Sequence, residues 1–241
     1  MPTLCDRPDA WYKAEDRDFL ALLGRTPGFW PVDKPAGMTS NTASNAVRRA
    51  ANARRAGHTG TLDPFATGVL VVALDEALRI VKYSERWDKE YEGTILLGVE
   101  TDSYDISGKV VRERSAAGVC EDAVRETLGR FIGEIVQKTP PVSAARVRGK
   151  RLYERARSGE RLAPPRIVTI HSIEVTHVEL PRVDVRIRCG RGTYIRSVAH
   201  ELGDTLGSGA VLESLRRTRE GPFTLEHCLN AGLDENVQRS T

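Results

Sequence analysis

Asp63 stands out chemically because it is a single carboxylate in a long basic stretch. The 29 positions between Asp33 and Asp63 hold no other acid, but they hold the cations Lys34, Arg48, Arg49, Arg54 and Arg55. Glycines bracket the turn, and glycine permits positive φ angles and close backbone approach. Pro64 favours an extended conformation of Asp63. We therefore expect a carboxylate presented in a groove to a polyanion, although an aspartate that caps its own turn has the same pattern.

The distribution of charge also indicates a polyanionic partner. The net charge is only +3, but residues 142–200 hold thirteen Lys and Arg against five Asp and Glu. This asymmetry is typical of a positive surface that faces phosphates. A well-solvated surface of strands and helices is the alternative.

The cysteines and the first residues indicate the compartment. The four cysteines lie far apart with no metal-type spacing, so we expect no zinc site and no disulfide framework. The first twenty residues are too highly charged for a signal sequence, and the longest uncharged stretches are too short to span a bilayer. We expect a cytoplasmic protein with no membrane partner.

Seven short motifs spread over residues 28–230 resemble those of the TruB-type tRNA pseudouridine synthases, in that family's order. The segment 57–68 around Asp63 resembles the catalytic segment of the family. The other resemblances lie at Gly28 with 33–41, at 89–93, at 101–105 with Gly108, at 143–144 with 149–150 and 153–157, at 192–196, and at 215–217.

The resemblance implies three catalytic residues: Asp63 as the carboxylate, Tyr91 as the active-site tyrosine and Arg196 as the partner of Asp63. A carboxylate can attack as a nucleophile or remove a proton, and the sequence does not separate these routes. A nearby guanidinium keeps it ionised. A tyrosine ring can stack on an extruded base for roughly 1–3 kcal/mol, although many strand tyrosines only pack.

Further residues are expected to bind the substrate. His58 resembles the family residue that inserts into RNA when a base is flipped out, although a lone histidine is often only a turn residue. Tyr194 belongs to the motif at 192–196, and Leu215 resembles an apolar wall of the uracil pocket. The candidate phosphate contacts, each of which is alternatively a solvated surface cation, are Lys34, Arg48, Arg54, Arg55, Arg148, Lys150, Arg151, Arg157 and Arg217.

The elements that position these residues follow from the hydrophobic pattern. It predicts strands at 28–33, 68–74 and 91–99, an antiparallel pair at 167–178 and 183–189, and helices from 39 or 40 to about 53, at 76–83, at 121–131 and at 195–206. Strands and helices mix without a βαβ repeat, which favours an α+β fold with a mostly antiparallel central sheet and flanking helices. The resemblance implies the pseudouridine synthase fold, with a catalytic cleft across one sheet face.

We expect an N-terminal extension at 1–27, a catalytic domain at 28–230 with a mobile RNA-binding loop at 140–159, and a tail at 231–241. Many family members continue into a PUA-type RNA-binding domain. The family pattern ends near residue 230 and only about ten residues follow it, so we expect no such domain, and the contacts that it makes toward the acceptor end of tRNA must be absent or replaced.

The resemblance implies an enzyme that isomerises uridine 55 in the T-arm of tRNA to pseudouridine, acting as a monomer. This reaction needs no redox step and no metal Lewis acid, so we expect no cofactor and no metal. Two rivals stay open. One is a non-catalytic tRNA-binding or folding module. The other is the same chemistry on another RNA, or on one presented by partner proteins, because specificity lies in shape and loop contacts.

Overall fold

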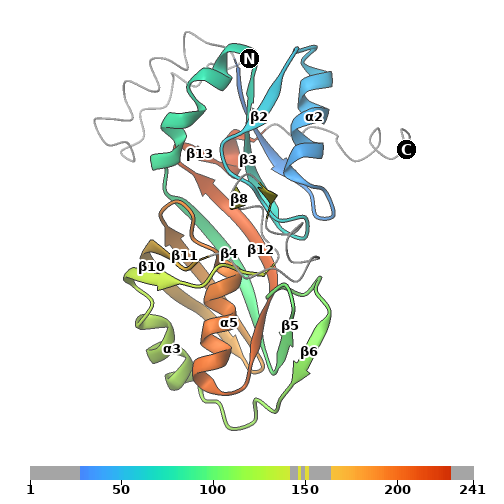
Figure 1. Cartoon of the computed structure of the whole chain (residues 1–241). Helices are drawn as coiled ribbons and strands as arrows, with labels where there is room; N and C mark the ends of the chain where they lie inside the picture. The colour runs from blue at the N-terminus through green and yellow to red at the C-terminus, as the bar shows by residue number, and fades with distance from the viewer. Residues whose placement is uncertain (1–27, 142–145, 148–149, 152–163, 229–241) are drawn as a thin grey trace. The chain divides into compact units, whose positions relative to one another are not determined.

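The computed structural model describes residues 28–141, 146–147, 150–151 and 164–228, which fall into two compact units (Figure 1). The first unit extends to Trp87 and resumes at Arg217, and the second comprises Asp88–Arg216. The expected extension, most of the expected loop and the tail lie outside the described residues. Each unit is described below by itself.

The first unit is built around a buried strand. Its elements are β1 (Phe29–Lys34), α2 (Ser40–Ala50), β2 (Ala56–His58), β3 (Thr67–Leu74), the 3₁₀ helices η2 (Asp75–Arg79) and η3 (Val81–Arg86), the end of β12 (Ala210–Glu220), β13 (Phe223–Thr224) and the 3₁₀ helix η4 (Leu225–His227). Residues 69–73 of β3 have no exposed surface, as expected for a run of β-branched and apolar residues. Antiparallel β1 and β2 pair with β3, and α2 packs beside them.

The expected helix at 76–83 is corrected to two 3₁₀ helices. Backbone amides of Ile80, Tyr83 and Trp87 donate to the carbonyl groups of residues three positions earlier. Only Ala77 is buried in η2 and only Ser84 in η3, so no continuous apolar stripe exists to hold an α-helix. The expected helix starting near Thr39 is confirmed, with Thr39 as N-cap, but it ends at Ala50.

The second unit is a sheet, in which β4, β11, β10 and β7 pair antiparallel, covered by two helices. Its elements are β4 (Lys89–Leu97), β5 (Val99–Thr101), β6 (Val110–Glu113), α3 (Glu121–Gly129), β7 (Gly133–Gln137), β8 (Arg146–Val147), β9 (Lys150–Arg151), β10 (Arg166–Glu179), β11 (Arg182–Cys189), α5 (Ile195–Leu206) and the beginning of β12. The strand order is β12-β4-β11-β10-β7, and α3 lies beside α5 (Figure 1). The expected α+β class is confirmed.

Most predicted elements of this unit are confirmed. β10 and β11 pair antiparallel as the β-branched pattern predicts. α5 ends at Leu206 and is capped by Gly207, whose φ of 74° suits a glycine C-cap. The strand expected to reach Val99 ends at Leu97, because Gly98 turns the chain with a φ of 93°. No helix in the described part of the chain is long and apolar enough to cross a membrane.

Candidate active site

The Asp63 loop of the first unit is fixed by the residues around the start of α2. The backbone amide of Gly37 donates to the carbonyl of Pro64 at 2.8 Å. The Ser40 hydroxyl donates to the carbonyl of Leu62 at 2.9 Å and accepts from the Leu62 amide at 2.8 Å. The backbone on both sides of Asp63 is therefore held, while Asp63 itself is half-buried. A fixed backbone limits the directions in which this carboxylate can point.

Lys34 holds the same loop from inside. Its side chain has no exposed surface, and Nζ donates to the carbonyl oxygens of Pro35 and Met38, each at 2.8 Å, and of Pro64 at 3.3 Å. Burial lowers the pKa of Lys34 to about 8, while the Asp63 carboxylate raises it and Arg217 lowers it. Lys34 was expected to contact phosphate, and this expectation is corrected. A buried ammonium that satisfies three carbonyls positions the loop instead.

Arg217 and Glu220 brace the other side of the turn. Both side chains are fully buried and form an ion pair at 3.0 Å. Arg217 also donates through Nε to the carbonyl of Val69 at 2.7 Å and through a terminal nitrogen to that of Gly60 at 3.0 Å. The Thr59 hydroxyl donates to Glu220 at 2.9 Å. The expected phosphate contact of Arg217 is therefore corrected too, because this guanidinium lies inside the protein.

His58 ends β2 opposite Val72 and is half-buried. Its Nδ1 atom is buried without a hydrogen-bond partner. Burial lowers the pKa of His58, the Glu220 carboxylate counteracts this, and Arg217 adds to it. The imidazole is therefore neutral at pH 7. Its insertion into RNA stays a prediction.

In the second unit, Tyr91 is the third residue of β4, lies opposite Ile187 of β11 and is buried. Two residues further on, β12 passes so close to Gly93 that a Cβ atom there would lie 2.7 Å from the carbonyl oxygen of Ser214. Leu215 is buried on the same stretch of β12. Tyr91 and Leu215 are thus carried by adjacent strands, and their expected roles at the base stay predictions.

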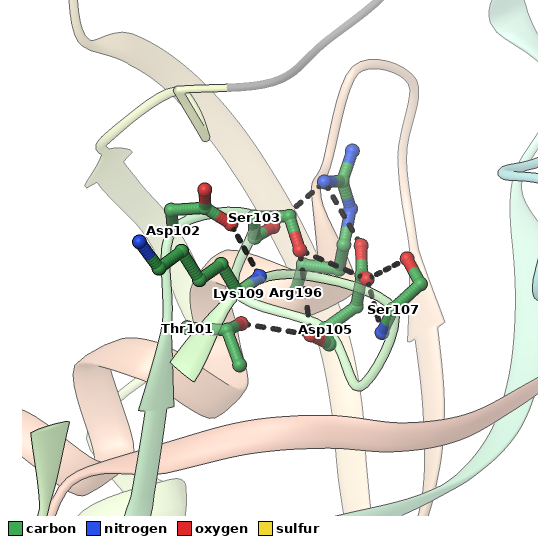
Figure 2. A network of polar contacts seen from close by, with 7 residues as sticks. All are labelled: Thr101, Asp102, Ser103, Asp105, Ser107, Lys109 and Arg196. Carbon is green, nitrogen blue, oxygen red and sulfur yellow. Dashed lines mark hydrogen bonds and ion pairs between the residues drawn. The ribbon is translucent and has the colours of Figure 1, made fainter. Parts of the chain in front are cut away.

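Arg196 occupies the first turn of α5, and its side chain is almost completely buried. One terminal nitrogen donates to the carbonyl of Ser103 at 2.8 Å and to the carboxylate of Asp105 at 3.2 Å (Figure 2). A buried guanidinium requires such compensation. The sequence motifs predicted that Arg196 is the partner of Asp63. Its contact with Asp105 was not foreseen.

The turn 101–108 is organised to present the Asp105 carboxylate. The Ser103 hydroxyl donates to it at 2.9 Å, the Ser107 amide donates at 3.0 Å, and the Ser107 hydroxyl donates to the same oxygen (Figure 2). The Thr101 hydroxyl donates to the Asp105 carbonyl at 2.7 Å. Gly108 is required here, since a Cβ atom would overlap the Ser103 side chain. The signal in the sequence was a cluster of Ser, Thr and Asp around a glycine.

Tyr194 precedes α5 and is positioned by Gln137, a buried side chain of β7. The Gln137 amide donates to the Tyr194 carbonyl at 3.0 Å and accepts from the Tyr194 backbone amide at 2.7 Å. The Arg166 guanidinium lies 5.5 Å from the centre of the Tyr194 ring. Gln137 was missed in the sequence, because a lone glutamine in a strand carries no recognisable signal.

The structure describes only some of the other residues that are predicted to contact phosphate. Arg54 and Arg55 are exposed and Arg48 is half-buried, as phosphate contacts require. Arg148 and Arg157 lie outside the described residues, as do the side chains of Lys150 and Arg151. The described residues contain no group of three or more His, Cys, Asp or Glu that could hold a metal ion.

Each unit, taken by itself, holds some of the predicted site residues in fixed positions. The first unit holds the Asp63 backbone rigidly between Ser40, Lys34 and Gly37. The second holds the Arg196 guanidinium on a carboxylate and bears Tyr91 on a central strand. Such fixed groups suit catalysis, because they need little reorganisation when charge develops. Their meeting at one substrate belongs to the proposed function.

Comparison with known proteins agrees with the motifs. The TruB family pseudouridylate synthase N-terminal domain matches residues 48–195. The tRNA pseudouridine synthase B of Geotalea uraniireducens (strain Rf4) is 43% identical over 213 residues, covering 88% of this chain and 68% of that protein. The protein of the same name from Thermobifida fusca (strain YX) is 47% identical over 213 residues, covering 85% and 72%.

A solved structure also resembles this fold. A chain in the crystal structure of a Cbf5–Nop10–Gar1 complex has a TM-score of 0.63 and 34% identity, covering 82% of the present chain. The present chain spans 50% of that solved chain. It also spans 64% of the tRNA pseudouridine synthase B of Aromatoleum aromaticum, to which it is 46% identical.

Proposed function

Because this chain belongs to the TruB family of pseudouridylate synthases, we propose that it converts uridine 55 in the T-arm of tRNA to pseudouridine. The reaction breaks the bond between C1′ of the ribose and N1 of the uracil, and it forms a bond between C1′ and C5. The proton on C5 is lost and N1 gains one, so the product is an isomer of the substrate. The proposal includes a monomer in the cytoplasm that needs no metal or cofactor.

In this proposal Asp63 supplies the carboxylate that acts at the ribose, either as a nucleophile or as a base. The observation that carries the proposal is the fixation of its loop by Lys34, Ser40 and Gly37. Arg196 keeps the carboxylate ionised and aims it, and Asp105 keeps Arg196 in place. Tyr91 stacks on the flipped uracil.

The test uses the purified chain and an unmodified tRNA transcript, with pseudouridine mapped by position. We expect pseudouridine at position 55, and none in a matched transcript with cytidine at that position. Asp63→Asn keeps the shape of the side chain but removes its charge, so it should fold normally and form no product. Substantial turnover by this variant would remove Asp63 from its role, and tRNA binding without product by the unsubstituted chain would support the non-catalytic module.

A second candidate is the same isomerisation on an RNA presented by partner proteins. The likeness to a chain crystallised in a Cbf5–Nop10–Gar1 complex favours it. Product in the naked transcript at position 55 would exclude a requirement for such partners. Product at another position only would favour a different RNA substrate.

A further inference from the structure

A stacked pair of rings lies directly beside the Arg196 site and has no part in the chemistry described above. The rings of Tyr104 and His200 are nearly parallel, with an interplanar angle of 8° and centroids 3.7 Å apart. Tyr104 lies between Ser103 and Asp105 in the turn 101–108. His200 lies four residues after Arg196, which places both side chains on the same face of α5. Helix and turn are thus joined twice, by this stack and by the contacts of Arg196.

The backbone of Tyr104 is unusual. Its φ angle is 66°, in the left-handed region that a bulky residue rarely adopts. Residues in sparsely populated conformations persist where surrounding contacts determine them, and they cluster at functional sites. The Tyr104 carbonyl accepts from the Leu212 amide at 3.1 Å, and the Ile106 amide donates to the Leu212 carbonyl at 3.0 Å. The stack on His200 adds the side-chain contact that faces α5.

The His200 ring stacks on Tyr104 through its face, whereas its two ring nitrogens make little polar contact. The Nδ1 atom is buried without a hydrogen-bond partner, and Nε2 lies 3.5 Å from the carboxylate of Asp204. Burial lowers the pKa of His200, the carboxylates of Asp204 and Glu100 counteract this, and Lys138 adds to it. Burial likewise raises the pKa of Tyr104, with help from Asp204, Glu201 and Glu100. At neutral pH both rings are therefore uncharged.

We propose that Tyr104 and His200 are a positioning pair that holds the turn 101–108 on α5 and thereby holds the Arg196 guanidinium in the orientation that the reaction requires. This inference rests on the proposed function of Arg196. The stack fixes Tyr104, which lies between the two turn residues that bind the guanidinium. Ser103 binds it through its backbone carbonyl, and Asp105 binds it through its carboxylate. A change of turn conformation would displace both partners together.

The test compares four variants on one tRNA transcript: Tyr104→Phe, Tyr104→Asn, His200→Phe and His200→Gln. Asparagine tolerates the left-handed conformation, so Tyr104→Asn removes the ring without a backbone penalty. We expect kcat to fall about three- to tenfold in Tyr104→Asn and His200→Gln, with KM unchanged. A rate factor of this size corresponds to the interaction energy of one stacked aromatic pair. Tyr104→Phe and His200→Phe retain a stack and should retain kcat. Unchanged kcat in the two ring-deleting variants would overturn the proposal.

Double variants separate positioning from general stabilisation. Tyr104→Asn alone should lower kcat, but adding it to Asp105→Asn should cause no further loss of kcat. The reason is that Asp105→Asn already breaks the same path to Arg196. Full, independent losses from both substitutions would contradict a path through Asp105. Circular dichroism and urea unfolding confirm that each rate refers to folded protein.

The wild-type arm distinguishes a failure of this inference from a failure of the proposed function. If wild type forms no pseudouridine, the proposed function fails, and amide hydrogen exchange then decides the positioning role. The Ile106 and Leu212 amides should exchange faster in Tyr104→Asn than in Tyr104→Phe. Equal exchange in the two variants would show that the stack does not hold the turn.

Discussion

Lys34, Arg196 and Arg217 share one property: each is a buried cation whose partners include backbone carbonyl oxygens of a motif segment. A buried charge is costly unless several acceptors surround it, and those acceptors are then held in place in turn. Lys34 and Arg217 hold the two flanks of the Asp63 turn, and Arg196 is held by the turn 101–108. At the scale of single residues, buried charge serves to order loops.

The first prediction concerns the partner of Arg196. Asp105→Asn keeps the size of the side chain but leaves a buried guanidinium without its carboxylate, which should lower the free energy of unfolding by about 3 kcal/mol or more. Urea denaturation measures this loss. The matched control is Asp102→Asn in the same turn, where an exposed carboxylate accepts from the Lys109 amide and an amide oxygen can replace it. Equal losses in both variants would contradict the role of Asp105.

The second prediction concerns pH. Burial lowers the pKa of Lys34 to about 8, below its ordinary value of 10.5, so the unfolded chain binds this proton more tightly than the folded one. The contribution of Lys34 to stability should therefore rise between pH 8 and 10.5, by up to about 1.4 kcal/mol per pH unit. Urea unfolding of wild type and Lys34→Met over this range isolates it as the difference between the two. A flat difference would mean that Lys34 keeps an ordinary pKa, and a falling one that its pKa is raised; either would contradict the prediction.

At this scale the sequence identified residue types better than their environments. The motifs single out Asp63, Tyr91 and Arg196, whose catalytic roles stay predictions. The prediction that Lys34 and Arg217 contact phosphate was wrong, because both side chains are fully buried. A cation that binds carbonyl oxygens and one that binds phosphates look the same in a sequence, because backbone acceptors leave no side-chain signal. The motif at 101–105 includes Asp105 but predicts no role for it, since its partner Arg196 lies far along the chain.

At the scale of elements, periodicity predicted what a single apolar face determines. β10, β11 and α5 show such faces and were foreseen, and β3 was foreseen from its continuous run of apolar residues, which is buried on both faces. β12 was not foreseen, because its second half is rich in charged residues, two of which, Arg217 and Glu220, are buried as an ion pair. The 3₁₀ helices after β3 were likewise mistaken for one α-helix.

The third prediction tests the close approach of β3 and β12. Gly68 has a φ of 102°, and a Cβ atom there would overlap the backbone of Arg217. Gly68→Ala should therefore lower the free energy of unfolding by more than about 2 kcal/mol. The control is Gly129→Ala, at the exposed end of α3 with no atom near its added Cβ, which should be neutral or stabilising by up to about 1 kcal/mol. Chemical denaturation of both variants measures the contrast, and a neutral Gly68→Ala would refute the close packing.

At the scale of the whole molecule, the modest net charge of +3 conceals an uneven distribution. Buried cations such as Lys34 and Arg217 contribute to this total but offer nothing to an RNA surface. Exposed ones such as Arg54 and Arg55 are available, because Asp75 accepts from their backbone amides and leaves their guanidinium groups outside that contact. The count of charges in the sequence therefore overstates the number that can contact phosphate.

The last prediction follows from this distinction. If Arg54 and Arg55 each neutralise one phosphate, tRNA affinity should fall with salt on a log–log plot, and Arg54→Gln with Arg55→Gln should reduce the slope by roughly 0.7–0.9 per residue. Filter binding or fluorescence anisotropy over a series of salt concentrations measures it. Arg130→Gln is the matched control, because this exposed arginine at the end of α3 is already paired with Glu126 at 2.7 Å. A slope that changes equally in all three variants would show that only net charge matters, and an unchanged slope in Arg54→Gln and Arg55→Gln would place the phosphate contacts elsewhere.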